Sequence, residues 1–233
     1  MNPHVSAGTI TAYYQTKFPN EVFLVEELPI FALIGVLSGL FGAFFVLIHR
    51  RIEYCRRTNR IFRRIFGKNP LIFTIVMAVF IGAATFPNGL GKYFAGKLTF
   101  GQTLADFISN CSLSQLNHSD RGCPPEMIER WTGESQSPLS PLLSLSLYFV
   151  FYYFVVAICV SLAVPAGIFV PSFVIGACGG RILGELMAIL YPDGIRGPGA
   201  PQIFPGLYAV VGESLTVMFY ARLCDVSEKI GGA

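Results

Sequence analysis

The chain has 233 residues, of which 53% are hydrophobic and only 13% are charged. It is too poor in charge for a typical soluble domain, since such domains carry roughly a quarter charged residues. Its mean hydropathy of +0.57 and its long apolar runs predict an all-α polytopic membrane protein. The six cysteines form no CxxC pair and the three histidines show no metal-ligand spacing, so we expect no metal site and no cofactor.

The amino-terminal part of the chain is interpreted as a connector, residues 1–28. It contains charged side chains and lacks a basic start followed by a short apolar core, so it is not read as a signal peptide. The first predicted span covers residues 29–48. Small residues recur in it at spacings of three and four, a pattern that lets helix backbones approach closely in lipid. We therefore expect this helix to pack against protein.

A basic segment follows, with seven arginines and one lysine against a single acid, Glu53, over residues 49–68. Such a patch can indicate nucleic-acid binding in a soluble protein. Between two apolar segments it is typical of a cytoplasmic loop that obeys the positive-inside rule, and it predicts such a loop over 49–70 with no nucleic-acid partner. The second span, 71–86, is short and ends at a Pro-Asn-Gly stop.

The polar loop over residues 88–138 is then predicted to be extracellular or lumenal. Two glycosylation sequons, at Asn110 and Asn117, fall inside it and agree with that side. Cys111 and Cys123 share the loop and could pair if it faces an oxidising compartment. The mixed polarity of residues 91–110 indicates a short interfacial helix.

The longest apolar stretch, residues 139–164, would return the chain to the cytoplasmic side. It carries six aromatic side chains over residues 148–154. These could form a lipid-facing surface or a core, and both interpretations stay open.

A helix broken by prolines and glycine is predicted over residues 164–180, which read VPAGIFVPSFVIGACGG. Pro165 fits the stop of the preceding helix, and Pro171 fits the first turn of a new one, where its missing N–H costs nothing. The new helix is expected over 171–191. Its glycines recur every four residues and predict a close-packing face: Gly176, Gly180 and Gly184.

The position of Arg181 indicates how deep in the membrane that helix starts. Arg181 and Glu185 are interpreted as an i,i+4 surface pair worth a few tenths of a kcal/mol. If they lie at the outer boundary, Pro171 lies about 15 Å deeper along the axis, near the middle of a hydrocarbon core about 30 Å thick. Irregular backbone at that depth is tolerated when it is buried in protein or lines a wet cavity.

A helix amino terminus at that depth presents unpaired N–H groups and partial positive charge, which suit an anion. Gly167 removes side-chain bulk. The backbone N–H groups of Ile168 and Phe169 would then donate to a dehydrated, halide-sized anion. The alternative is a kink with only a packing role.

Three separated stretches resemble the CLC family of chloride channels and chloride/proton exchangers. They are ELPIFALIGVLSGLFGAFFVLIHRRI, PAGIFVPSFVIGACGGRILGELM and YPDGI followed by PGLYAVVG. They occur in the family's order, the resemblance runs from about residue 9 to residue 212, and it is strongest to the plasma-membrane channel branch of animals.

The resemblance implies a partial CLC-like bundle of tilted, broken and re-entrant helices over residues 29–212, within a multi-pass plasma-membrane protein. It implies a voltage-gated chloride channel that is a homodimer with an anion pathway in each subunit. It also implies that Gly167, Ile168 and Phe169 bind chloride through backbone amides, with Pro165, Val170 and Pro171 as structural residues of the motif.

Other motifs of the family do not occur in this sequence. The G-S-G-I-P and G-K-E-G-P motifs and the cytoplasmic nucleotide-binding modules are missing, and residues 213–233 diverge. We therefore interpret the chain as an internal or truncated product that does not conduct alone and that associates with full-length subunits. A chloride/proton exchanger and a non-conducting regulatory isoform are the alternatives within the family.

Two other function classes compete with this interpretation. An intramembrane enzyme needs paired aspartates, a nucleophile with its base, or a metal site inside the spans. The aspartates and histidines all lie outside the predicted spans, so no enzyme is expected. A transporter of organic anions would use the same broken helix, and competition among small anions distinguishes it from a chloride site.

Overall fold

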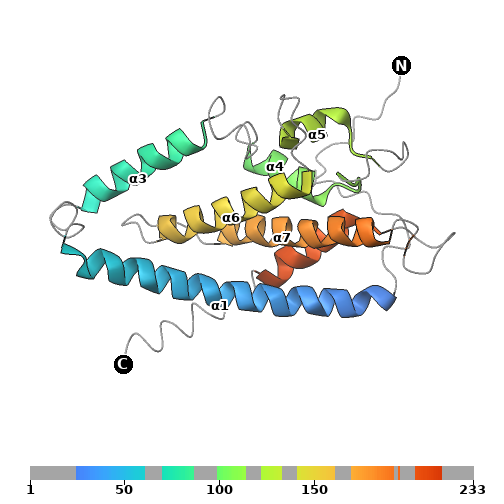
Figure 1. The fold of residues 1–233 in the computed structure, drawn as a ribbon, viewed down its shortest axis with the longest axis horizontal. Coiled ribbons are helices and arrows are strands. Elements are labelled where there is room, and N and C mark those ends of the chain that lie inside the picture. The colour runs from blue at the N-terminus through green and yellow to red at the C-terminus, as the bar shows by residue number, and fades with distance from the viewer. Residues whose placement is uncertain are drawn as a thin grey trace, which may run out of the picture.

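The computed structural model describes residues 25–60, 70–86, 99–113, 122–132, 141–160, 169–191, 194 and 203–216. These residues form helices and one isolated bridge, between Ser112 and Gly122. The named helices (Figure 1) are η1 (Val25–Glu27), α1 (Leu28–Thr58), α3 (Pro70–Ala84), α4 (Phe100–Ile108), α5 (Pro125–Thr132), α6 (Pro141–Val160) and α7 (Phe169–Leu190). A further helical segment covers residues 205–216.

The prediction of a polytopic all-α membrane protein is confirmed. Within the described residues, three helical stretches are long and apolar enough to cross a membrane: Val25–Ile52, Pro141–Val160 and Phe169–Leu190. α3 is a shorter apolar helix of 15 residues, as its short apolar run predicts.

α1 is longer than the sequence predicts. Its 31 residues correspond to about 46 Å, so it exceeds a hydrocarbon core of about 30 Å. Residues 49–58, expected as the start of a loop, continue the helix instead. They contain no proline or glycine, and arginine is a good helix former. The helix ends where Asn59 turns extended and donates its N–H to the carbonyl of Cys55 at 2.9 Å.

α6 and α7 run antiparallel at the centre of the bundle, and α1 lies along them (Figure 1). Tyr153 joins α6 to α1, because its hydroxyl donates to the carbonyl of Phe41 at 2.6 Å. Tyr153 is buried, whereas Phe154 is 46% exposed. The aromatic cluster of α6 therefore serves largely as core, with Phe154 turned outward.

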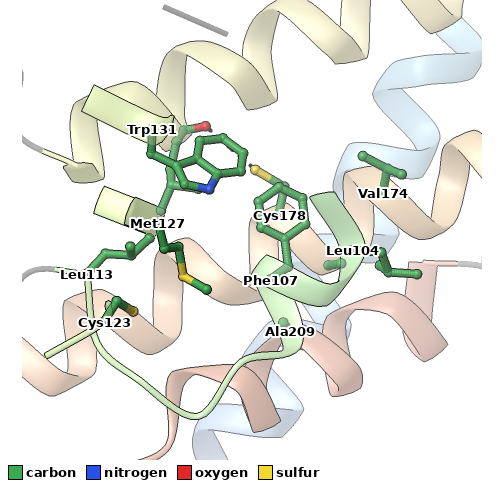
Figure 2. Close-up of a cluster of buried hydrophobic side chains, with 11 residues drawn as sticks. Leu104, Phe107, Leu113, Cys123, Met127, Trp131, Val174, Cys178 and Ala209 are labelled. Carbon is green, nitrogen blue, oxygen red and sulfur yellow. Dashed lines mark hydrogen bonds between the residues drawn. The ribbon is translucent and has the colours of Figure 1, made fainter. Parts of the chain in front are cut away.

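α4 and α5 cover the half of α7 that carries its carboxyl end (Figure 1). The apolar side of α4 is buried in the main core, where Phe107 contacts the ring of Trp131 at a centroid distance of 5.2 Å. Figure 2 shows these rings beside Cys178 of α7. The short helix expected in the outer loop thus exists, and its apolar face is packed against protein.

Candidate functional site

The amino terminus of α7 is where the sequence places the anion site. α7 begins at Phe169, and Pro171 is its third residue, so the prediction that Pro171 lies in the first turn of a new helix is confirmed. Pro165, Gly167 and Ile168 lie outside the described residues. Their part in an anion site stays a prediction.

The first turn of α7 presents backbone rather than charged side chains. Phe169 and Val170 are 60% and 50% exposed, and the Phe169 ring rests edge-on against Phe173 at 4.7 Å. The Ser172 hydroxyl donates back to the Phe169 carbonyl at 2.7 Å. The first N–H groups of a helix have no acceptor within it, and they carry the positive end of the helix dipole. This turn can therefore bind an anion through its amides.

The glycine face of α7 fixes the helix against residues 205–216, as the spacing of the glycines predicts. A Cβ on Gly176 would come within 2.6 Å of the Gly212 carbonyl oxygen, and one on Gly184 within 2.8 Å of the Pro205 Cα. A Cβ on Gly180 would overlap the Tyr208 carbonyl. No larger residue fits at these points, so the two backbones are in direct contact.

Arg181 and Glu185 form a buried ion pair, and the prediction of a surface pair is wrong. Their side chains are 0% and 1% exposed, with Nη2 of Arg181 3.1 Å from Oε1 of Glu185. The guanidinium also donates to three carbonyl oxygens, those of Phe107, Ser109 and Cys111. Burial is possible because these bonds replace the water that both ions lose.

Glu185 is bound by the same segment of chain. Its carboxylate accepts a hydrogen bond from the Ser112 hydroxyl at 2.7 Å and another from the Leu113 N–H at 2.9 Å. We call Arg181, Glu185 and residues 107–113 the loop clamp. It fastens the segment after α4 to the carboxyl half of α7.

A disulfide between Cys111 and Cys123 closes the segment next to the loop clamp. The pairing left open by the sequence is therefore formed in the structure. The Cys123 N–H also donates to the Ser112 carbonyl at 3.2 Å, so this part of the loop is held by covalent and hydrogen bonds together.

Comparison with known proteins identifies the family. The profile described as voltage gated chloride channel matches residues 4–221. The chain belongs to this family. The match extends past Glu213, where the sequence analysis places the start of a divergent tail, and the boundaries of that tail stay a prediction.

Individual members of the voltage gated chloride channel family resemble the chain over most of its length. It is 41% identical to "Chloride channel protein clh-3" of Caenorhabditis elegans over 219 residues, 89% of this chain and 22% of that protein. It is 35% identical to "Chloride channel protein 2" of Cavia porcellus over 206 residues, and 36% identical to "Chloride channel protein" of Tetronarce californica over 210. These alignments cover 88% of this chain and 22% and 25% of the two relatives. The chain thus spans about a quarter of the relatives' length.

Membership in the voltage gated chloride channel family confirms the predicted resemblance and the membrane location. The three relatives are each named chloride channel proteins.

Of the two predicted glycosylation residues, the structure describes Asn110 only. Asn110 is exposed, while Ser112 of its sequon is buried and donates to Glu185. Asn117 lies outside the described residues. Use of either sequon stays a prediction.

Two ionisable side chains of α4 and α5, Asp106 and Arg130, have structural partners. Asp106 is buried, accepts a hydrogen bond from the Trp131 Nε1 at 3.2 Å and lies 3.8 Å from Arg130. Burial raises the pKa of this carboxyl, although Arg130 opposes the shift. Within the described part of the chain no group of three histidine, cysteine or acidic side chains could hold a metal ion.

The loop clamp is the feature that sequence reasoning missed. Its partners lie 70 to 74 residues before Arg181 in the chain, and no local pattern connects them. One signal was present, because Arg181 and Glu185 are the only charged residues between Phe169 and Leu190. Two charges within an apolar helix indicate burial with partners.

Proposed function

We propose that this chain forms part of a voltage-gated chloride channel and that the first turn of α7 forms one wall of its anion pathway. The observation that carries the proposal is the start of α7 at Phe169, which is one of the three residues predicted to bind chloride. The chain belongs to the voltage gated chloride channel family. Chloride would be bound by the backbone N–H groups of Gly167, Ile168 and Phe169. Val170, Pro165 and Pro171 would shape the turn.

The position of the loop clamp supports the depth of this site. Phe169 precedes Arg181 by twelve residues, which is about 18 Å along a helix. Arg181 is bonded to Ser109 and Cys111, in the segment between α4 and α5, which the basic-residue pattern assigns to the outer side. With a hydrocarbon core about 30 Å thick, the first turn of α7 lies well inside the membrane.

The chemistry of the first turn favours a small anion without a fixed counter-ion. The side chains from Phe169 to Ser172 carry no charge, so attraction comes from peptide dipoles. Such dipoles act strongly where water is scarce. We expect the site to accept chloride, bromide and nitrate and to be indifferent to sodium. A large organic anion is the competing substrate.

An amide titration tests this proposal. The chain, labelled with ¹⁵N at isoleucine and phenylalanine, is placed in nanodiscs and titrated with sodium chloride at constant ionic strength set by sodium gluconate. We expect saturable shifts at Ile168 and Phe169 and none at Ile189, which lies at the far end of α7. Shifts that follow sodium, or no shifts at Ile168 and Phe169, would contradict the proposal.

We also propose that the chain does not conduct by itself. It covers about a quarter of the relatives' length, and α1 leaves large apolar side chains exposed: Leu33, Val36, Leu40, Phe44 and Leu47. These faces suit partner helices, from a second copy in a homodimer or from full-length subunits at the plasma membrane. Chloride flux from liposomes that contain only this chain would contradict the proposal.

A regulatory isoform is the second candidate function within the family. The same exposed face of α1 favours it, because a partial chain that binds a full-length subunit can occupy a helix-packing site without completing a pathway. A chloride/proton exchanger remains an alternative for the complete protein. Proton-coupled chloride flux in a complete assembly would favour the exchanger.

A further inference from the structure

We propose that the loop clamp is a positioning device for the anion site, so that the Cys111–Cys123 disulfide controls the chloride affinity of α7 from the outer side. This inference rests on the proposed function of the first turn of α7. It assigns Arg181 and Glu185 a positioning role, since neither residue lies at the predicted anion site.

The first argument is the pattern of bonds to Arg181. Its Nη1 donates to the carbonyls of Phe107 at 2.9 Å and Ser109 at 2.5 Å, and its Nη2 donates to the carbonyl of Cys111. Three alternate carbonyls of one segment thus converge on a single buried cation. This arrangement requires a fixed backbone shape from Phe107 to Cys111.

The second argument is that the disulfide holds this shape. Cys111 supplies one of the three carbonyls and is itself cross-linked to Cys123. The next two residues, Ser112 and Leu113, bind Glu185. When the cross-link is absent, the segment gains conformational entropy. Forming its hydrogen bonds to Arg181 and Glu185 then costs more of that entropy.

The third argument is that the same segment is held on its other side. A Cβ on Gly206 would come within 2.6 Å of the Ser109 carbonyl oxygen, so residues 108–109 rest directly on the helix 205–216. That helix packs in turn on Gly180 and Gly184 of α7. At this level α7 is held between the loop and the helix 205–216.

The effect on the anion site follows from the stiffness of α7. Phe169 and Val170 are largely exposed in this chain, so the rest of α7 sets much of their position. A rotation of about 3° at Arg181 displaces a point about 18 Å away by roughly 1 Å. Binding constellations tolerate displacements of about 0.5 Å, so a loosened clamp should weaken chloride binding.

The test compares the oxidised chain with the Cys111→Ser/Cys123→Ser double variant in nanodiscs. Hydrogen exchange at Phe173 and Val174, whose N–H groups lie four residues after the carbonyls of Phe169 and Val170, reports how firmly the first turn is held without any chloride, and the amide titration reports affinity. We expect faster exchange at the first turn in the double variant and chloride affinity lower by about fivefold or more. Cys55→Ser, which removes an exposed thiol on α1, is the matched control and should change neither.

Arg181→Lys provides a second variant that keeps the charge and loses the fork of donors. We expect it to act as the disulfide variant does, while Arg51→Lys on the exposed face of α1 has no effect. Faster exchange confined to residues 107–113, with the first turn and the affinity unchanged, would overturn the inference and leave the proposed function intact. If the oxidised chain binds no chloride, the proposed function fails and the exchange comparison still decides the coupling.

Discussion

At the scale of single residues, the α7 glycines lie in direct contact with the backbone of residues 205–216. A Cβ on Gly180 would overlap the carbonyl of Tyr208, whereas a Cβ on Gly82 of α3 would meet nothing within 4 Å. Both glycines lie inside helices. They therefore form a matched pair for separating packing from helix propensity.

We predict that Gly180→Ala destabilises the chain by about 3 kcal/mol, because the packed backbones cannot yield. Gly82→Ala should stabilise it by up to about 1 kcal/mol, since alanine is the better helix former. Denaturation in mixed micelles, followed by circular dichroism, measures both. Equal effects of the two changes would show that α7 and residues 205–216 do not touch as described.

The buried carboxyl of Asp106 on α4 should make the stability of the fold depend on pH. Burial raises the pKa of its carboxyl above the unfolded value of 3.8, so the folded state holds the proton more tightly than the unfolded state. The stability that this provides is complete below that value and is lost as the pH rises through the folded pKa.

Asp106→Asn cannot ionise and can still accept the Trp131 hydrogen bond. We predict that its unfolding midpoint depends less on pH than that of the unchanged chain as the pH rises above the unfolded value of 3.8. Glu129→Gln, an exposed change on α5, should leave the pH dependence as it was. A variant profile parallel to the original would contradict the assignment to Asp106.

At the scale of elements, local signals predicted the start of α7 and the glycine face that packs it. Pro171 and the glycines act on their own backbone, so their effect can be recognised from neighbouring residues. The extension of α1 to Thr58 was missed because the positive-inside rule reports the side of a segment and not its conformation. The burial of Arg181 was missed because its partners are distant in sequence.

The basic extension of α1 provides a test of sidedness through an exposed native thiol, Cys55. We predict that a membrane-impermeant maleimide labels Cys55 from the cytoplasmic side only, in a chain whose Cys159, a partly exposed free cysteine, and Cys224 have both been changed to serine. Cys55→Ser should abolish the labelling, because Cys178 is buried. Labelling of Cys55 from outside the cell would reverse the assigned orientation of α1.

At the scale of the whole molecule, the described helices form a core and leave apolar faces that suit further helices of the family. The chain's share of its relatives' length, about a quarter, agrees with this. The number of partners and the completion of the proposed pathway could not be predicted, because the chain spans about a quarter of its relatives' length.

Association with full-length subunits predicts a dominant effect in cells. Co-expression with a full-length channel of the family should lower its chloride current at constant surface expression. A variant of the exposed α1 face, Leu40→Ser together with Leu47→Ser, should lower it less, because both side chains are more than 60% exposed and available for partners. Unchanged current with the original chain would count against association.

The central claim is that backbone amides at the start of α7 bind the anion, and the most direct test removes one of them. Replacing Phe169 by its α-hydroxy acid turns its amide into an ester and removes the N–H while the side chain stays. A hydrogen bond to a charged group contributes about 1.5–3 kcal/mol, so we predict chloride affinity lower by about ten- to a hundredfold. The same replacement at Ile182, in the middle of α7, should leave affinity unchanged. Chloride affinity that is unaffected by the ester at Phe169 would contradict the account.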